Sequence, residues 1–325
     1  MTKYLDTIKK EIDETELSVV SKKVIKSTIN KMQKYDKDIY KNPDSLITLI
    51  KMFLRTTENL NTCHTFIAHI KSMLKHTSLK DMINEADQKE IEKLFIRYKN
   101  LKERKDDAEE PSEKHKENYI PYDEMVKHFK KVKDTLNWKD KLMYGLYILQ
   151  PPLRADYGEV KLILNTDKNE DWELEDYSDI TKNYFIIDQS RFIINQYKSN
   201  KVMGKDGELK HKPLDFICNN EVYDLIYESI ELRLKEEGII REFLIEDKFG
   251  KAMQPNTLSK NITRISEILF KKPIGIQEIR TIYCSRFLLQ DEKCSIDTII
   301  NDAQNMGHST STHIKKYMKR YITPE

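Results

Sequence analysis

The chain has 325 residues, of which 34% are charged and 38% hydrophobic, with a formal net charge of +2. This composition excludes a disordered chain and is typical of a highly charged globular protein, for which the length predicts about two domains. No run of 18 apolar residues occurs and the N-terminal stretch lacks an apolar signal-peptide core. We therefore expect a soluble, intracellular protein with no membrane partner; the sequence does not choose between nucleus and cytoplasm.

Glycine and cysteine are both sparse. The eight glycines all lie at or after Gly145, which excludes a glycine-rich nucleotide-binding loop from the preceding residues and favours packed helices there. The four cysteines are scattered without a Cys-x-x-Cys pair. The sequence therefore predicts no disulfide framework, no metal site and no cofactor.

Residues 1–102 are predicted to form a helical bundle. Apolar residues recur at three- and four-residue steps in four stretches, at 18–32, 46–54, 62–74 and 85–102. Asn42–Ser45 carries the start signals of the second helix. The first hundred residues hold 19 Lys and Arg against 14 acidic residues, a balance that permits contact with a nucleic-acid backbone.

A charged segment with almost no apolar residue follows at 103–118. We predict a solvated linker there, between the first domain and a second domain over 119–325.

The second domain is predicted to be mixed. Helical patterns cover 122–136, 138–149, 222–235, 256–270, 277–289, 296–305 and 312–321. Between them, β-branched and aromatic runs at 185–187, 192–197 and 210–216 flank a polar stretch with Gly204 and Gly207, which predicts a small hairpin-rich sheet. The fold class is therefore mainly α with a small β-sheet, α+β.

Three segments far apart in the chain carry residues that belong together. Arg154 follows an apolar helix in LQPPLRADYGEV, and Arg280 lies in IQEIRTIYCSRF. Near the C-terminus, His308 follows a glycine and Tyr317 stands nine residues after it. This combination resembles the tyrosine recombinases, also called phage-type integrases. The resemblance implies a core-binding helical bundle followed by a catalytic domain.

The chemistry of these residue types agrees with that resemblance. A tyrosine hydroxyl can attack a phosphodiester and hold the phosphate as an ester, and two arginines can clamp the phosphoryl oxygens with permanently charged forks. By the resemblance, Tyr317 is the nucleophile, Arg154 and Arg280 bind the phosphate, and His308 donates to a non-bridging oxygen. Tyr321 is a rival nucleophile, and His313, which falls outside the pattern, is expected to be solvated.

A lysine is needed to protonate the departing 5′ oxygen. The strand that ends at Lys198 resembles the hairpin of the family, and Lys201 is its rival.

The supporting groups of the two arginines are less defined. Asp156 and Glu159 are both close enough to orient Arg154, because Tyr157 occupies the position where the family commonly has an acid. For Arg280 the alternative to a phosphate contact is a structural salt bridge.

Gln277 stands where the family's His-x-x-Arg pattern places a histidine. An amide can donate to phosphate but cannot carry a proton at neutral pH. Either Gln277 only positions the phosphate, or His308 or solvent takes the Tyr317 proton. We expect slower cleavage than a histidine would give, and the variant Gln277→His tests this on a nicked substrate.

The resemblance thus implies a site-specific recombinase or integrase that forms a covalent 3′-phosphotyrosyl intermediate without metal or ATP. Its partner would be double-stranded DNA, bound by a homo-tetramer on two sites. The Lys-, Asn- and Ile-rich composition suggests an AT-rich source such as a virus or mobile element. The alternatives are a type IB topoisomerase, a DNA-binding relative that has lost catalysis, and a helical scaffold protein.

Overall fold

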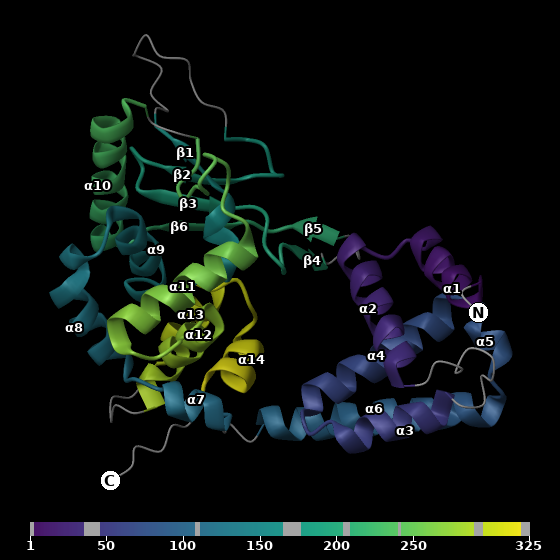
Figure 1. The fold of residues 1–325 in the computed structure, drawn as a ribbon. Coiled ribbons are helices and arrows are strands. Elements are labelled where there is room, and N and C mark those ends of the chain that lie inside the picture. Colours follow the sequence, from purple (N-terminus) through teal and green to yellow (C-terminus); the bar gives the residue numbers. More distant parts are fainter. Residues whose placement is uncertain are drawn as a thin grey trace. The chain divides into compact units, whose positions relative to one another are not determined.

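The computed structural model describes residues 3–35, 46–107, 111–164, 177–203, 209–239, 242–288 and 295–319. The chain divides into two compact units, Met1–Ala108 and Glu109–Glu325, which are described separately below (Figure 1). The expected fold class, mainly α with a small β-sheet, is confirmed.

The first unit consists of helices in its described residues. They are α1 (Lys3–Glu14), α2 (Val19–Tyr35), α3 (Leu46–Thr56), α4 (Leu60–His76), α5 (Leu79–Met82) and α6 (Glu85–Asp107). The central helix is α4, which packs against each of the others and begins where Asn59 accepts the backbone N–H of Thr62. The predicted start of the second helix at Asn42–Ser45 lies outside the described residues, and α1 and α5 were not expected.

Much of the segment 103–118, where a solvated linker was expected, is helical. Helix α6 continues to Asp107, and α7 (Glu113–Asn118) begins at Ser112, whose hydroxyl accepts the backbone N–H of His115. Asn118 is buried and its amide donates to Glu278 at 3.2 Å. Helix caps and a tertiary hydrogen bond therefore order much of a stretch that has almost no apolar residue. The division between the two compact units falls within this segment.

The second unit combines helices with short strands. After α7, its longer helices are α8 (Tyr122–Val132), α9 (Trp138–Ile148), α10 (Asn220–Glu237), α11 (Pro255–Phe270), α12 (Ile276–Ser285) and α13 (Ile296–Asn305). Its strands are β1 (Val160–Ile163), β2 (Asn183–Ile186), β3 (Arg191–Ile194), β4 (Lys201–Met203), β5 (Leu209–His211) and β6 (Leu214–Ile217). The described chain ends in α14 (Thr310–Thr312) and the π-helical turn η5 (His313–Tyr317).

Four strands form one mixed sheet in the order β1-β2-β3-β6. β1 runs parallel to β2, and the other pairs are antiparallel. β4 and β5 pair separately as a two-stranded ribbon. Gly204 and Gly207, between β4 and β5, lie outside the described residues, and β1 was not expected from the sequence.

Helix α9 is the centre of this unit's core. It packs closely against α10, because a Cβ at Gly145 would lie only 2.3 Å from Leu225 Cδ1. The Tyr147 hydroxyl donates to the main-chain oxygen of Arg154 at 2.6 Å. The core of the unit thereby fixes the backbone that carries Arg154. None of the described helices has the length and apolarity that crossing a membrane requires.

Candidate active site

Arg280 lies at the centre of the candidate site and is fully buried on α12. Its Nε and Nη2 atoms each donate to the Tyr317 hydroxyl at 3.3 Å, and Nη2 also lies 3.1 Å from His308 Nδ1. Nη1 donates to the carbonyl oxygen of Pro152. In the part of the chain that the structure describes, Arg280 forms no ion pair, so the structural salt bridge considered from the sequence is not found there.

Tyr317 is 4% exposed and is held between Arg280 and His308. Its ring stacks on the His308 ring, with centroids 4.9 Å apart and planes inclined by 13°. Burial raises the pKa of its hydroxyl, but the positive charge and hydrogen bonds of Arg280, the charge of Arg154 and a hydrogen bond with Gln277 together bring that pKa below its ordinary value. The cluster therefore stabilises the phenolate, which is the nucleophilic form, relative to that of a free tyrosine.

The backbone around Tyr317 is a π-helical turn. The sequence predicted an ordinary helix over 312–321, whereas α14 ends at Thr312 and the wider turn η5 follows. Ser285 anchors this turn, because its hydroxyl donates to the Tyr317 carbonyl oxygen at 3.1 Å and accepts the Lys319 N–H at 2.8 Å. Such turns often occur at functional sites. Tyr321, the rival nucleophile, lies outside the described residues.

His308 is placed by a tight turn after α13. Gly307 has φ +66°, and a Cβ there would lie 3.0 Å from Leu214 and 3.1 Å from the Tyr197 ring, so glycine alone fits without strain. Burial, Arg280, His313 and Arg154 lower the pKa of His308 to about 3. His308 is therefore a neutral imidazole at neutral pH.

The expectation that His313 is solvated is wrong. Its side chain is fully buried, with Nδ1 3.1 Å from His308 Nε2 and 3.8 Å from the sulfur of Cys284. His313 is the first residue of the π-helical turn, which packs against α12, and its place outside the His308–Tyr317 pattern gave no indication of this burial.

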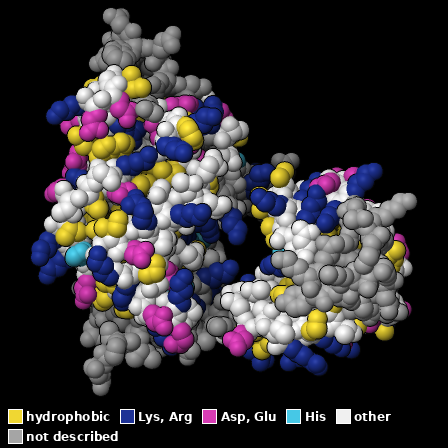
Figure 2. Space-filling view, viewed as in Figure 1, with side chains coloured by type: hydrophobic (Ala, Val, Ile, Leu, Met, Phe, Trp, Pro, Cys, Tyr) yellow, Lys and Arg dark blue, Asp and Glu magenta, His cyan; other side chains and the backbone are white. Residues whose placement is uncertain are grey.

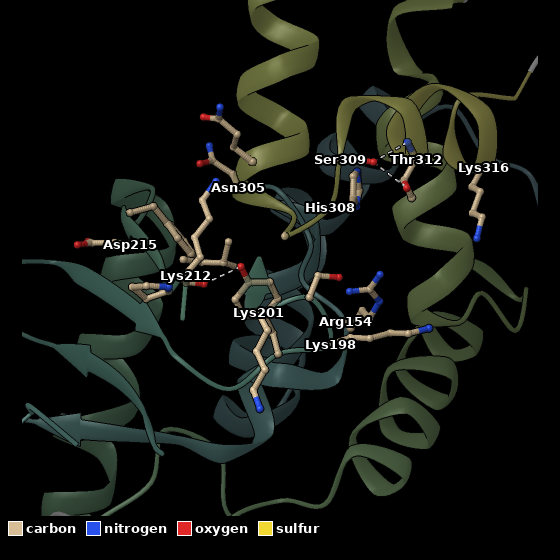
Figure 3. Close-up of a pocket in the computed structure, with 17 residues that line it drawn as sticks. Arg154, Lys198, Lys201, Lys212, Asp215, Asn305, His308, Ser309, Thr312 and Lys316 are labelled. Carbon is tan, nitrogen blue, oxygen red and sulfur yellow. Dashed lines mark hydrogen bonds between the residues drawn. The ribbon is translucent and has the colours of Figure 1, made fainter. Parts of the chain in front are cut away.

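A pocket of about 710 Å³ opens beside this cluster, and basic side chains dominate its lining (Figure 3). The basic residues are Arg154, Lys198, Lys201, Lys212 and Lys316. Asp215 is the acidic member of the described lining, and it is paired with Arg191. His308 also lines the pocket, whereas Tyr317 and Arg280 lie behind it. Lys212 and Lys316 were missed by the sequence analysis, since a lysine-rich chain gives no signal that separates them from solvated lysines.

Lys and Arg side chains also extend across the middle of the face of residues 109–325 that Figure 2 shows. The pocket and the surface have the charge that attracts a polyanion.

Arg154 is partly buried and follows Pro151 and Pro152 at the exit of α9. Burial raises the pKa of Asp156, while the charge of Arg154 and backbone N–H groups act in the opposite direction. The charge of Arg154 therefore acts on the partly buried Asp156, whereas Glu159 is exposed.

The two candidate lysines lie close together in sequence but differ in direction. Lys198 belongs to the turn that follows β3, and Lys201 begins β4. In Figure 3 the Lys198 side chain extends toward the Arg154 side of the pocket, and the Lys201 side chain extends away from it. Both side chains are exposed.

Gln277 is exposed in the first turn of α12, and its side chain is hydrogen-bonded with Tyr317. The structure thus brings Gln277, Arg280, His308 and Tyr317 into one contact cluster. It places Arg154 and Lys198 with His308 along the adjoining pocket.

No protein-family model matches the chain, and no curated protein matches it in sequence. Among solved structures, the crystal structure of XerA recombinase is similar with a TM-score of 0.40 and 11% sequence identity, over 97% of this chain and 94% of that chain. A likeness this weak assigns no function to this chain.

Proposed function

We propose that this protein breaks and rejoins double-stranded DNA by transesterification, through a covalent 3′-phosphotyrosyl intermediate on Tyr317. The observation that carries the proposal is the Tyr317 hydroxyl held by two N–H groups of a buried Arg280, with its pKa lowered, behind a basic pocket. A phenol activated in this way beside a site for an anion is suited to attack on phosphorus.

In the proposed reaction the Tyr317 oxygen attacks the phosphorus atom, and the bond from phosphorus to the 5′ oxygen breaks. Arg154 and Arg280 bind the non-bridging oxygens, which takes up the charge that develops in the transition state. The Lys198 ammonium group gives its proton to the departing 5′ oxygen. The phenol proton passes to water, because the Gln277 amide cannot accept it and both His308 ring nitrogens face protein groups.

An entering phosphate binds Arg280 next to the phenol oxygen and shares its N–H groups, which in the structure point to Tyr317 and are therefore already aligned. Rejoining is the reverse reaction, with a 5′ hydroxyl as the attacking group. The reaction as proposed uses neither a metal ion nor ATP.

Site specificity, integration and a homo-tetramer on two DNA sites belong to the same proposal and are supported by the resemblance to tyrosine recombinases alone.

The test is covalent trapping on a nicked suicide substrate, from which the cleaved end diffuses away. We expect the wild type to form a protein–DNA adduct whose peptide contains Tyr317. The variant Tyr317→Phe should form no adduct and still bind DNA, while Tyr227→Phe, which changes an exposed tyrosine on α10, should react like the wild type. An adduct in Tyr317→Phe would assign the nucleophile elsewhere, for example to Tyr321.

The same experiment separates the alternatives. A wild type that binds DNA but never forms an adduct would be a DNA-binding protein without catalysis. Adduct formation combined with relaxation of supercoiled plasmid, but without recombinant joints, would assign the reaction to the type IB topoisomerase class.

A further inference from the structure

Both ring nitrogens of His308 are within hydrogen-bond distance of other side chains. Nδ1 lies 3.1 Å from Arg280 Nη2, and Nε2 lies 3.1 Å from His313 Nδ1. The second contact, between His308 and His313, has no role in the reaction as proposed so far.

The protonation of His308 follows from Arg280. A guanidinium group can only donate, so the His308 Nδ1 that faces it must be the unprotonated, accepting nitrogen. Because the pKa of His308 is about 3, the ring is neutral at neutral pH and carries its single proton on Nε2. That Nε2–H group then donates to His313 Nδ1.

The state of His313 follows in turn. Burial lowers its pKa to about 4, with Arg286 and Arg280 acting in the same direction and Asp302 opposing them, so this ring is neutral as well. Since its Nδ1 accepts, its proton lies on Nε2, which is buried and has no hydrogen-bond partner among the described residues. The Cys284 sulfur, 3.8 Å from Nδ1, packs beside the accepting nitrogen.

The hydrogen bonds therefore run in a directed series. Arg280 donates to the Tyr317 oxygen and to His308, and His308 donates to His313. Every donor in the series is oriented by its neighbour, and the His308 ring is held flat against the Tyr317 ring at the same time. A buried imidazole with one unpartnered nitrogen is unfavourable on its own, which argues that its accepting nitrogen has a specific task.

We propose that His313 is a positioning residue: by accepting the His308 Nε2–H it fixes the His308 ring, with unprotonated Nδ1 toward Arg280 and its face against Tyr317. The inference deepens the proposed function, on which its catalytic consequence rests. In this arrangement His308 acts on the reaction by orienting Arg280 and Tyr317. The N–H that the resemblance assigns to a phosphate oxygen is directed to His313 in the structure.

Two substitutions separate positioning from packing. His313→Asn keeps an accepting oxygen on Cγ, where Nδ1 is attached in histidine, and His313→Leu keeps the bulk but removes the acceptor. His128→Leu, at an exposed position of α8, is the control.

The first readout is spectroscopic and independent of activity. In protein with ¹⁵N-labelled histidine, we expect wild-type His308 to show a protonated Nε2, an unprotonated Nδ1 and a slowly exchanging Nε2–H. The slowly exchanging signal should persist in His313→Asn and in His128→Leu and disappear in His313→Leu. A His308 protonated on Nδ1 in the wild type, or a signal that persists unchanged in His313→Leu, would overturn the assignment.

The second readout is the rate of adduct formation on the suicide substrate. We expect His313→Leu to lose on the order of tenfold in rate at unchanged DNA affinity, and His313→Asn to recover most of it, because small displacements of reacting groups have large kinetic effects. Equal losses in both variants would indicate packing alone, and no loss in His313→Leu would remove the catalytic consequence; either result overturns the proposal. If the wild type forms no adduct, the proposed function fails, and the spectroscopic readout still decides whether His313 positions His308.

Discussion

Arg280 differs from Arg286 and Lys141, two other cations of its unit, in how its charge is balanced. Arg286 pairs with Asp302 at 2.6 Å, and Lys141 pairs with Glu228 at 2.7 Å. Arg280 is more deeply buried than either, yet over the described ranges its partners are carbonyl oxygens, an imidazole and a phenol. A buried charge without a counter-charge costs folding free energy, which a ligand of opposite charge can offset. A phosphate group is that ligand in the proposed reaction.

The two neutral histidines make the stability of the second unit depend on pH. An unfolded histidine binds a proton as the pH falls below about 6.5, whereas folded His313 and His308 stay neutral down to pKa values of about 4 and about 3. The unfolded state thus binds more protons in this window. As the pH is lowered, the free energy of unfolding therefore decreases by roughly 1 kcal/mol per pH unit for each group. We expect the free energy of unfolding of this unit to be highest above pH 7 and to decrease steadily from pH 7 to pH 4.

The contribution of His313 is measured by difference, because carboxyl groups titrate in the same range. Denaturant unfolding followed by tryptophan fluorescence reports on this unit, since both tryptophans lie in 109–325. Between pH 6.5 and 4, the free energy of unfolding should decrease less in His313→Asn than in the wild type. In His128→Asn it should decrease as much as in the wild type. Equal slopes in His313→Asn and wild type would mean that His313 titrates normally in the folded protein.

At the scale of elements, the turn between α13 and α14 decides where His308 lies. Gly307 and Gly238 both have positive φ, +66° and +71°, but a Cβ at Gly238 meets nothing within 4 Å. Gly238→Ala should therefore cost only the backbone strain, about 1 kcal/mol. Gly307→Ala should cost about 1 kcal/mol more, because its Cβ also meets Leu214 and Tyr197. It should also slow adduct formation, as His308 is displaced. Denaturant unfolding and covalent trapping check this pair; equal costs for the two variants would contradict it.

The sequence predicted best those elements whose evidence is local. Helices with regular apolar spacing, such as α4 and α9, occur where expected. The α1 helix was missed although Ile8 and Ile12, four residues apart, are both fully buried, so its signal was present. By contrast, α7 and β1 depend on tertiary partners: Asn118 bonds to Glu278, and β1 pairs with β2 more than 20 residues later.

The candidate site likewise combines features that are local in the sequence with features that depend on the fold. The spacing from His308 to Tyr317 is local and visible in the sequence. The contact of Arg280 with both residues, the effect of the Arg154 charge on Asp156 and the burial of His313 depend on the fold. The π-helical turn that begins at His313 differs from the ordinary helix that the sequence predicted over 312–321.

At the scale of the whole molecule, each of the two compact units has its own apolar core. One core is built from residues between Ile8 and Leu94, and the other from residues between Met125 and Ile282. Since no described core cluster includes residues of both units, the free energy that stabilises each arises mainly within it.

We therefore expect the fragments 1–108 and 109–325 to fold when produced separately. The isolated fragment 109–325 should have the same denaturation midpoint as this unit has in the full chain, because its core is complete. Tryptophan fluorescence measures both midpoints. Far-UV circular dichroism of the full chain should follow both units and match the sum of the two fragments. A markedly lower midpoint for isolated 109–325 would mean that the units stabilise each other. In covalent trapping, 109–325 should still form the adduct, since the contact cluster and pocket lie within it. We expect it to need a higher DNA concentration, because the net positive charge of residues 1–100 favours phosphate contacts that the fragment lacks.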